Sequence, residues 1–388
     1  MYVTRPLSWY RKHPSNLSTK PEEPFSGYLV ITDEEAQAED SFCFGMCRRR
    51  GVPKLPFPQD KLLTVYHLSG MDETMRTKVW FLPVLGQPLS SNRYYAIKAK
   101  GRYKGQVCKC SKEAEMGLCC FGNYINDKRP RPFDHRDIYQ QVKINRHYRH
   151  TFFANSVAPD GIPPKFLKKK GWKVRSSKSY QSELIEALGL DVTARSLLPS
   201  LDFPIYNKHS HSVVVGKWCC PFVFVREEYR LREQMKRSLL YKMTLEQKWE
   251  EIFSCQNVNN ESRVNVDVDV QRKVNLVFGM EALKENRNDE GGFVWYRGRN
   301  RFNGRGVRLG LSSAIVEKMK WVEEVGGFVD GGERVVRVER REEIDSERVW
   351  RRFACYVLVE SFILRRWDGT LIMKTQFRHT NHIQCKWD

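Results

Sequence analysis

Four cysteines in one short segment are the first residues whose types and spacing could support chemistry. They form a Cys-x-Cys pair and an adjacent pair, Cys108 with Cys110 and Cys119 with Cys120. A structural zinc site needs four converging thiolate or imidazole ligands, usually from pairs spaced by two to four residues. The spacing here is tighter, and adjacent cysteines on a strand point to opposite faces. The four are therefore candidate metal ligands, with buried apolar packing or redox-sensitive surface thiols as the favoured alternatives.

A basic tract supplies the second set of candidates. Residues 165–178 read KFLKKKGWKVRSSK, with seven positive charges and no negative one. Basic side chains neutralise phosphates, and aromatic rings between them stack on unpaired bases, so the tract suits single-stranded nucleic acid or an anionic lipid surface. A solvated loop is the alternative. The candidate anion-binding residues are Lys165, Lys168, Lys169, Lys170, Trp172, Lys173 and Arg175.

The sequence contains none of the common catalytic signatures. No G-x-S-x-G string, Walker A loop or HExxH motif occurs, and the glycines of GRGVRLG at 304–310 are not spaced as in a dinucleotide-binding turn. With 11 cysteines and nine histidines, a Cys–His pair could form in space, but the sequence singles out none. We therefore predict no catalytic residue and no cofactor, and favour a non-enzymatic protein. An enzyme with an unrecognised Cys–His site is the alternative.

Charge and cysteine content bear on partners and compartment. The net charge is +20, and residues 51–250 hold 35 Lys and Arg against 18 Asp and Glu. Such an excess attracts polyanions, although it also simply keeps a protein in solution. The first 18 residues lack the apolar core of a secretory signal, and no apolar run is long enough to span a membrane. With an odd number of cysteines, these features predict a soluble protein of the cytosol or nucleus.

Short strand-like runs dominate the elements that must position these residues. Before residue 155 they are separated by Pro, Gly and Ser-Asn clusters, which is typical of antiparallel strands joined by turns. The sequence predicts an α+β fold with mostly antiparallel sheets in two packed lobes. The N-terminal lobe is expected to be nearly all-β and the C-terminal lobe mixed. The predicted boundaries are an irregular tail at 1–26, a β-rich lobe at 27–155, a basic connection with a short helix at 156–204, and an α+β lobe at 205–388.

Two main helices are predicted in the C-terminal lobe. One covers residues 230–253, where apolar residues recur every four positions and TLEQ resembles a capping box. The other covers 312–327, an amphipathic segment that ends at two glycines. Between them, RVNVDVDV alternates strictly and predicts a half-buried strand. Asp368-Gly369 between two apolar runs predicts a hairpin.

Several strings in order along the whole chain closely resemble a plant family catalogued as domain of unknown function 1262. Among them are MYVTRPLSWYRK, SGYLVITDEEA, PVLGQPLSSNRYYAI, APDGIPPKFLKKKGW, VVVGKWCCPFVFV and FACYVLVESFILRRWDGTL. The resemblance implies a land-plant protein of a multi-member set linked to stress or defence, and it transfers no catalytic residue. Taken together, these observations predict a non-enzymatic binding or interaction protein with an unassigned partner, either a protein or a polyanion. A nucleic-acid or anionic-lipid binder that uses the 165–178 tract is the alternative.

Overall fold

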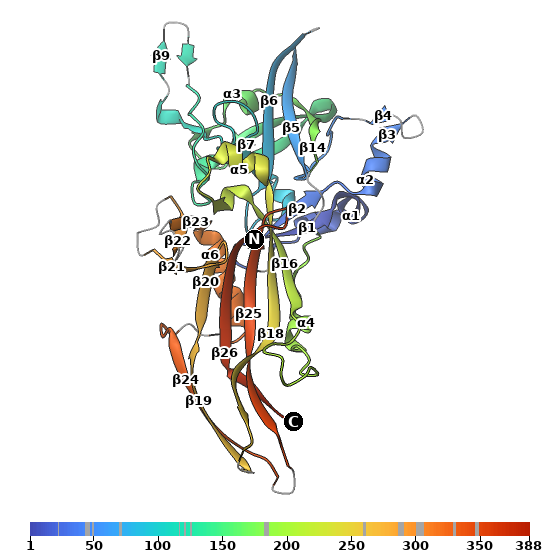
Figure 1. The fold of residues 1–388 in the computed structure, drawn as a ribbon. Helices are drawn as coiled ribbons and strands as arrows, with labels where there is room; N and C mark the ends of the chain where they lie inside the picture. The colour runs from blue at the N-terminus through green and yellow to red at the C-terminus, as the bar shows by residue number, and fades with distance from the viewer. Residues whose placement is uncertain are drawn as a thin grey trace.

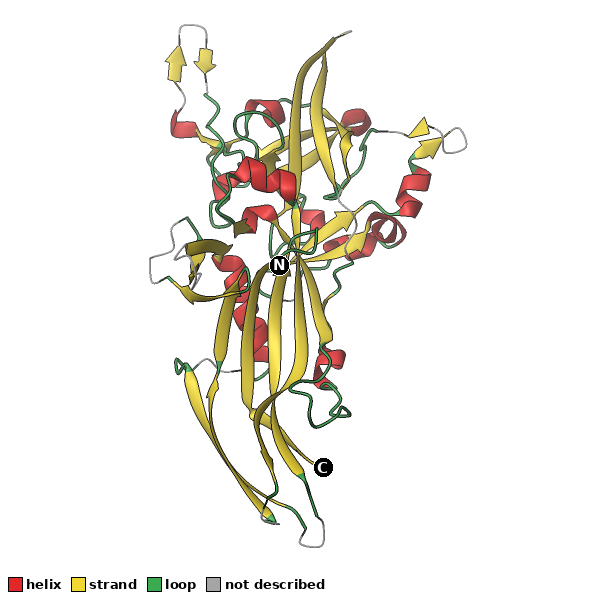
Figure 2. Ribbon diagram, in the orientation of Figure 1, coloured by secondary structure: helices red, strands yellow, loops and turns green. Residues whose placement is uncertain are grey.

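The protein is mostly β, so the predicted α+β class with two main helices is wrong. Strands account for 49% and helical segments for 18% of it, and strands dominate Figure 2. The structure is a computed structural model. It describes every residue except 22, 43–46, 49, 70–71, 116, 120–121, 125, 182–185, 259–260, 286–290, 300–305, 329–330 and 346–348.

A 12-stranded sheet, here called the large sheet, forms the body of the molecule (Figure 1). Its strand order is β17-β23-β22-β21-β20-β26-β25-β18-β16-β1-β2, and β15 pairs with β16. The pairs are antiparallel except for β1 with β2, which is parallel. The strands are β1 Tyr2–Pro6, β2 Gly27–Ile31, β15 Gly189–Leu190, β16 Val213–Pro221, β17 Val225–Arg226, β18 Leu240–Gln256, β20 Lys273–Val277, β21 Met280–Lys284, β22 Phe293–Arg299, β23 Gly306–Ser312, β25 Arg352–Arg365 and β26 Leu371–Trp387.

The longest strands, β18, β25 and β26, lie side by side at the centre of the large sheet. β25 carries a nearly continuous apolar run, typical of a strand that is buried on both faces. The expected hairpin between β25 and β26 is confirmed. Gly369 adopts φ +85 in its turn, a left-handed conformation that glycine tolerates best.

A six-stranded sheet, here called the small sheet, lies at the top of Figure 1. Its order is β12-β11-β7-β6-β5-β14, with antiparallel neighbours throughout. Three of the short strand-like runs before residue 155, at 62–68, 78–85 and 93–100, fall on β5, β6 and β7. The strands are β5 Lys61–Ser69, β6 Asp72–Pro83, β7 Arg93–Lys98, β11 Gln141–His147, β12 Thr151–Ser156 and β14 Lys173–Gln181.

One apolar cluster joins the two sheets, so the predicted pair of packed lobes is replaced by two sheets that share a core. Trp80 and Ile97 of the small sheet belong to the same buried cluster as Trp218 and Phe362 of the large sheet. The small sheet also has a cluster of its own around Phe81. The sheets therefore share a core, to which α6, Ser313–Val325, also contributes Ile315 and Met319.

Residues 1–26, expected as an irregular tail, contribute to this arrangement. Met1 and Tyr2 are fully buried, and β1 pairs with both β2 and β16. The first helix follows β1 directly. The helices are α1 Leu7–Lys12, α2 Glu34–Glu39, α3 Lys165–Lys168, α4 Val192–Ser196, α5 Leu231–Arg237 and α6 Ser313–Val325.

The prediction of a helix over 230–253 is wrong after residue 237. α5 ends at Arg237, Ser238 is extended with φ −151 and ψ 117, and β18 begins two residues later. The four-residue spacing from Leu231 to Met235 is helical, but the sequence then changes period. Buried side chains recur at every second position, as a strand requires: Tyr241, Met243, Leu245, Gln247 and Trp249. The short helix predicted near residues 182–188 falls largely outside the described residues, and 186–188 are not helical.

The predictions for α6 and for the alternating strand are confirmed. α6 covers 13 residues and ends at Gly326, with Ile315, Met319 and Val322 buried. β19, Arg263–Gln271, pairs with β24, Val335–Glu343, as a separate two-stranded ribbon. The remaining short strands are β3 Ser41–Phe42, β4 Cys47–Arg48, β8 Ser111–Lys112, β9 Gly117–Cys119, β10 Gly122–Tyr124 and β13 Gly161–Ile162.

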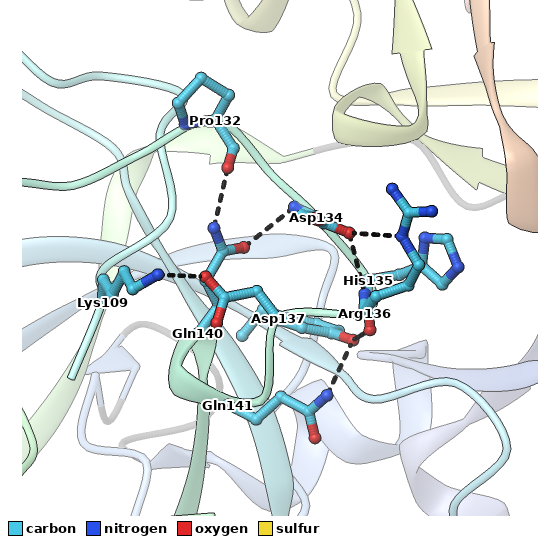
Figure 3. A network of polar contacts seen from close by, with 9 residues as sticks. Lys109, Pro132, Asp134, His135, Arg136, Asp137, Gln140 and Gln141 are labelled. Atoms are coloured by element: carbon cyan, nitrogen blue, oxygen red, sulfur yellow. Dashed lines mark hydrogen bonds and ion pairs between the residues drawn. The ribbon is translucent and has the colours of Figure 1, made fainter. Parts of the chain in front are cut away.

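A polar network fixes the loop that carries Phe133 into the shared core (Figure 3). Gln140 accepts a hydrogen bond from the Asp134 backbone N–H at 3.0 Å and donates to the Pro132 carbonyl at 2.8 Å. Lys109 Nζ donates to Asp137 at 2.6 Å. Held in this way, the Phe133 ring makes edge contacts with Tyr95 and Phe224 at centroid distances of 4.9 and 4.6 Å.

Replacing Phe133 tests the shared core. Phe133→Ala should lower the free energy of unfolding by about 3–5 kcal/mol, because it removes a ring buried between the sheets. Ile138→Ala, in the same loop but 41% exposed, should change it by less than about 1 kcal/mol. Urea denaturation followed by tryptophan fluorescence measures both variants. An equal decrease in the free energy of unfolding in the two variants would show that the Phe133 ring does not join the sheets.

Candidate functional site

A cleft of about 850 Å³ lies between the N-terminal helices and one edge of the small sheet. Three segments enclose it: α1 with the turn that follows it, α2, and an irregular proline-rich stretch at residues 50–58. The end of β14 closes the remaining side. Its walls are formed by Leu7, Tyr10, Pro14, Leu17, Thr32, Val52, Leu55, Pro56, Pro58, Ser176 and Ser177, with charged residues at Arg11, Glu39, Asp40, Arg50, Lys54 and Lys61.

Asp33 holds the two helices that form one wall. Its side chain caps α2 by accepting a hydrogen bond from the Ala36 backbone N–H at 3.2 Å. It also accepts hydrogen bonds from the Ser8 hydroxyl and, at 3.3 Å, from the Ser8 backbone N–H. One carboxylate therefore sets α1 against α2, and the pair of helices forms a fixed wall.

The opposite wall is an extension of the small sheet. The Val52 N–H donates to the Val174 carbonyl at 2.9 Å, and the Ser176 N–H donates to the Arg50 carbonyl at 2.7 Å. Residues 50–52 thus lie along the edge of β14. The pairing of β14 with β5 is irregular after Ser176, and this irregular end, with Ser177, borders the cleft.

The charges of the cleft are unevenly compensated. Arg11 forms ion pairs with Glu39 and, at 3.5 Å, with Asp40. Three further cations line the cleft and have no ion-pair partner among the described residues: Arg50, Lys54 and Lys61. Arg50 and Lys54 are exposed and Lys61 is half-buried. The cleft therefore combines apolar and proline walls with an excess of positive charge, which suits an anion with an apolar body.

Asp60 is buried beside this cleft. It contacts Thr32 and precedes Lys61 in the chain, and both of these residues line the cleft. The Thr32 hydroxyl donates to Asp60 at 3.2 Å. Burial raises the pKa of Asp60 to about 6, against a smaller lowering effect of the Lys61 charge. The carboxyl is therefore partly protonated in mildly acidic solution.

The predicted anion-binding tract is divided between core and surface. Trp172 is fully buried, donates from its indole N–H to the Leu167 carbonyl at 2.9 Å, and packs on Phe152 at 5.2 Å. Its ring therefore lies where no base could stack on it. Lys165, Lys168, Lys169, Lys170 and Arg175 are exposed, and Lys173 is half-buried. Lys170 Nζ lies 5.4 Å from the centre of the Phe153 ring.

The structure does not bring the four candidate metal ligands into a described site. Cys108 and Cys110 are buried in the small sheet's own cluster, and burial raises the pKa values of their thiols to about 12 and 11. Cys119 lies in β9, but its side chain is not described, and Cys120 is outside the described residues. The described part of the chain holds no group of three or more His, Cys, Asp and Glu that could bind a metal ion.

The seven cysteines whose side chains are described are free thiols: Cys108, Cys110, Cys219, Cys220, Cys255, Cys355 and Cys385. The sequence did not predict the cleft, because its lining residues come from two distant parts of the chain, positions 7–61 and 176–177. The proline-rich stretch at 50–58 was the available signal, but its prolines and cations read as an ordinary turn.

Comparison with known proteins supports a family likeness over part of the chain. Residues 22–121, about a quarter of it, match the family described as "Protein of unknown function (DUF1262)". This segment contributes α2, residues 50–58 and Lys61 to the cleft. No curated protein matches the chain.

One solved structure is similar in shape, the crystal structure of Cry35Ab1. It is 11% identical with a TM-score of 0.47, and the match covers 85% of this chain and 90% of that one. A likeness of this size assigns neither a fold family nor a function. The longest described helix, α6, has 13 residues, so no helix in the described ranges reaches across a bilayer.

The raised pKa of Asp60 makes a prediction about stability. An unfolded aspartate titrates near pH 4, so between about pH 4 and 6 the folded state binds more protons and the contribution of Asp60 to stability falls as the pH rises. Asp60→Asn cannot ionise. Its free energy of unfolding relative to the native protein should therefore rise by about 1–3 kcal/mol between pH 4 and 7 and then stay level. Urea denaturation at a series of pH values measures this difference, and a constant difference would contradict the assignment.

Proposed function

We propose that this protein acts by binding rather than by catalysis, and that its cleft takes a small anion with an apolar body. The observation that carries the proposal is the set of three cations, Arg50, Lys54 and Lys61, without ion-pair partners among the described residues. Apolar side chains and prolines between them offer a surface for a hydrocarbon or aromatic body. The volume of about 850 Å³ lies in the usual range for small-molecule sites, about 300–1,000 Å³.

The charge balance of the walls favours an anion over a cation. The two acidic residues of the cleft, Glu39 and Asp40, already bind Arg11. A cationic ligand would have to displace that guanidinium, whereas an anionic ligand meets the exposed Arg50 and Lys54 and also Lys61, whose charge acts on Asp60 as well. Each charge-assisted hydrogen bond formed in this way contributes about 1.5–3 kcal/mol.

The organism, the compartment and the biological role are also part of this proposal. We infer a plant protein of the cytosol or nucleus with a role in stress or defence. The described free thiols and the charge of +20 support a reducing compartment and polyanionic or protein partners. The resemblance of the sequence strings to the plant family supports the plant setting and the link to stress.

A fluorescent anion tests the cleft. 1-Anilinonaphthalene-8-sulfonate carries a sulfonate on an aromatic body, and N-phenyl-1-naphthylamine is its uncharged counterpart. The native protein should bind the sulfonate more tightly. The double variant Lys54→Glu/Lys61→Glu should bind it at least about tenfold more weakly, because two attractive charges become repulsive. Fluorescence titration at fixed ionic strength gives the dissociation constants.

The matched control is Lys143→Glu/Lys284→Glu, which changes the net charge equally at two exposed lysines that do not line the cleft. It should bind the sulfonate within about twofold of the native protein, since their distance from the cleft leaves mainly a screened long-range effect. Equal loss in both double variants would attribute binding to net charge alone. If the native protein binds the uncharged N-phenyl-1-naphthylamine as tightly as it binds the sulfonate, the three cations have no role in binding.

The exposed lysines of the 165–178 tract support a second candidate function, binding of single-stranded nucleic acid. Lys168, Lys169 and Lys170 are consecutive and all exposed. With Trp172 in the core, stacking contributes nothing there, so such binding would be electrostatic and independent of base sequence.

Charge reversal tests this second candidate. Lys168→Glu/Lys169→Glu/Lys170→Glu should abolish most of the binding to a labelled oligothymidine. The dependence of log affinity on log salt concentration should become shallower by about 0.7 for each phosphate that the lysines no longer neutralise. Fluorescence anisotropy over a range of salt concentrations measures both. Unchanged affinity and slope would exclude the tract as the binding surface.

A further inference from the structure

A buried polar cluster interrupts the apolar core of the large sheet. Gln247 on β18 lies directly opposite Glu360 on β25, and His379 on β26 lies one row further along the same face. Arg195 of α4 covers them. Apolar clusters lie on both sides: one contains Leu245 and Phe362, and the other contains Trp249 and Leu358.

Both oxygens of the Glu360 carboxylate have hydrogen-bond donors within reach. Arg195 Nε donates to Oε1 at 2.8 Å and Nη2 donates to Oε2, Gln247 Nε2 donates to Oε1 at 2.9 Å, and His379 Nε2 lies 3.0 Å from Oε2. Burial acts to raise the pKa of Glu360, but the hydrogen bonds from His379 and Arg195 hold it below its usual range. The group is therefore ionised, and His379 must carry its hydrogen on Nε2 to donate to it.

Two buried atoms of the cluster are left without a partner among the described residues. They are His379 Nδ1 and Gln247 Oε1. With the His379 hydrogen on Nε2, Nδ1 of the neutral ring is an acceptor, as Oε1 of Gln247 always is. A buried polar group without a hydrogen bond costs about 1–3 kcal/mol. Both side chains line a cavity of about 270 Å³, so a hydroxyl group there could donate its one hydrogen to either atom.

The rest of the cavity is largely apolar and opens to solvent. Leu190 and Leu358 contribute to its walls, and Val192 and Val325, which are 64% and 53% exposed, lie on opposite segments at its border. Leu198, also in the wall, has φ +54, a left-handed conformation that is unusual for leucine and that clusters at functional sites. The floor of the cavity is thus polar, and its border is apolar apart from the exposed Ser196 and His382.

We propose that this cavity binds a small uncharged molecule with an apolar body and a hydroxyl group. The hydroxyl donates to His379 Nδ1 or to Gln247 Oε1, and the body lies against Val192 and Val325. A carboxylate in this position would meet the ionised Glu360 and two acceptors. An ammonium group would approach Arg195 and find the Glu360 oxygens already occupied. The volume corresponds to a ligand with a single ring.

Gly326 at the end of α6 keeps the floor in place. Arg195 Nη1 donates to the Val322 carbonyl at 2.8 Å, so its guanidinium lies across the helix end. A Cβ atom at residue 326 would come within 1.9 Å of Nη2. Gly326→Ala must therefore displace Arg195 and disturb Glu360, because the three atoms nearest to the new Cβ all belong to the Arg195 guanidinium.

The test compares two probes, 4-methylphenol and 4-methylanisole, which differ in a methyl group on the oxygen. Protein labelled with ¹⁵N-histidine is titrated with each, and the Nδ1 resonance of His379 is assigned from its loss in His379→Gln. The phenol should move that resonance saturably. The ether should bind at least about tenfold more weakly, because it cannot donate.

Two variants separate a binding site from a merely structural cluster. Val192→Ser changes an exposed side chain and should weaken phenol binding several-fold while leaving the unfolding temperature unchanged. Gly326→Ala should abolish the response of His379, whereas Gly298→Ala, where a Cβ meets only ordinary contacts at 3.5 Å, should preserve it. No response at millimolar phenol, or equal binding of phenol and ether, would overturn the proposal and leave bound water as the occupant.

Discussion

The apolar cluster shared by the large and small sheets is the constraint on which the rest of the structure depends. The chain begins in the large sheet with β1 and β2, forms the small sheet, and returns to the large sheet at β15 and β16. The two sheets are packed on one another, because Trp80 and Trp218 belong to one core. The cleft follows from this path, since α1, α2 and residues 50–58 lie where the chain passes between the sheets.

Local periodicity predicted the elements whose environment is simple. β19 alternates because one face is wet, and α6 has an apolar stripe because it covers a sheet. The failure at β18 has a physical cause. Its two faces are both partly buried, and polar residues such as Gln247 occupy buried positions with hydrogen-bonded partners, so the alternation of apolar and polar residues is blurred. Because the four-residue spacing of α5 is helical, the helix was predicted to continue beyond Arg237 into β18.

The candidate sites depended on long-range contacts that a sequence does not reveal. The lysines of the 165–178 tract were found because they are contiguous, but the role of Trp172 was decided by the ring stacking of Phe152 and Phe81. Arg195 and Glu360 are 165 positions apart and meet only because the Arg195 side chain reaches from α4 to β25. Residue types show where cations and cysteines occur in the chain, but only the folded chain shows which cations lack ion-pair partners among the described residues and which thiols are buried.

Glu360 also sets the alignment of the long central strands. β18, β25 and β26 have 17, 14 and 17 residues, and a strand as long and apolar as β25 could pair with its neighbours in several alignments. A slip of two residues would keep every side chain on its face, yet it would carry Glu360 away from Arg195 into apolar surroundings. An unpaired buried charge costs several kcal/mol. The one charged residue among the twelve buried positions of β25 thus excludes misaligned sheets that apolar packing alone would tolerate.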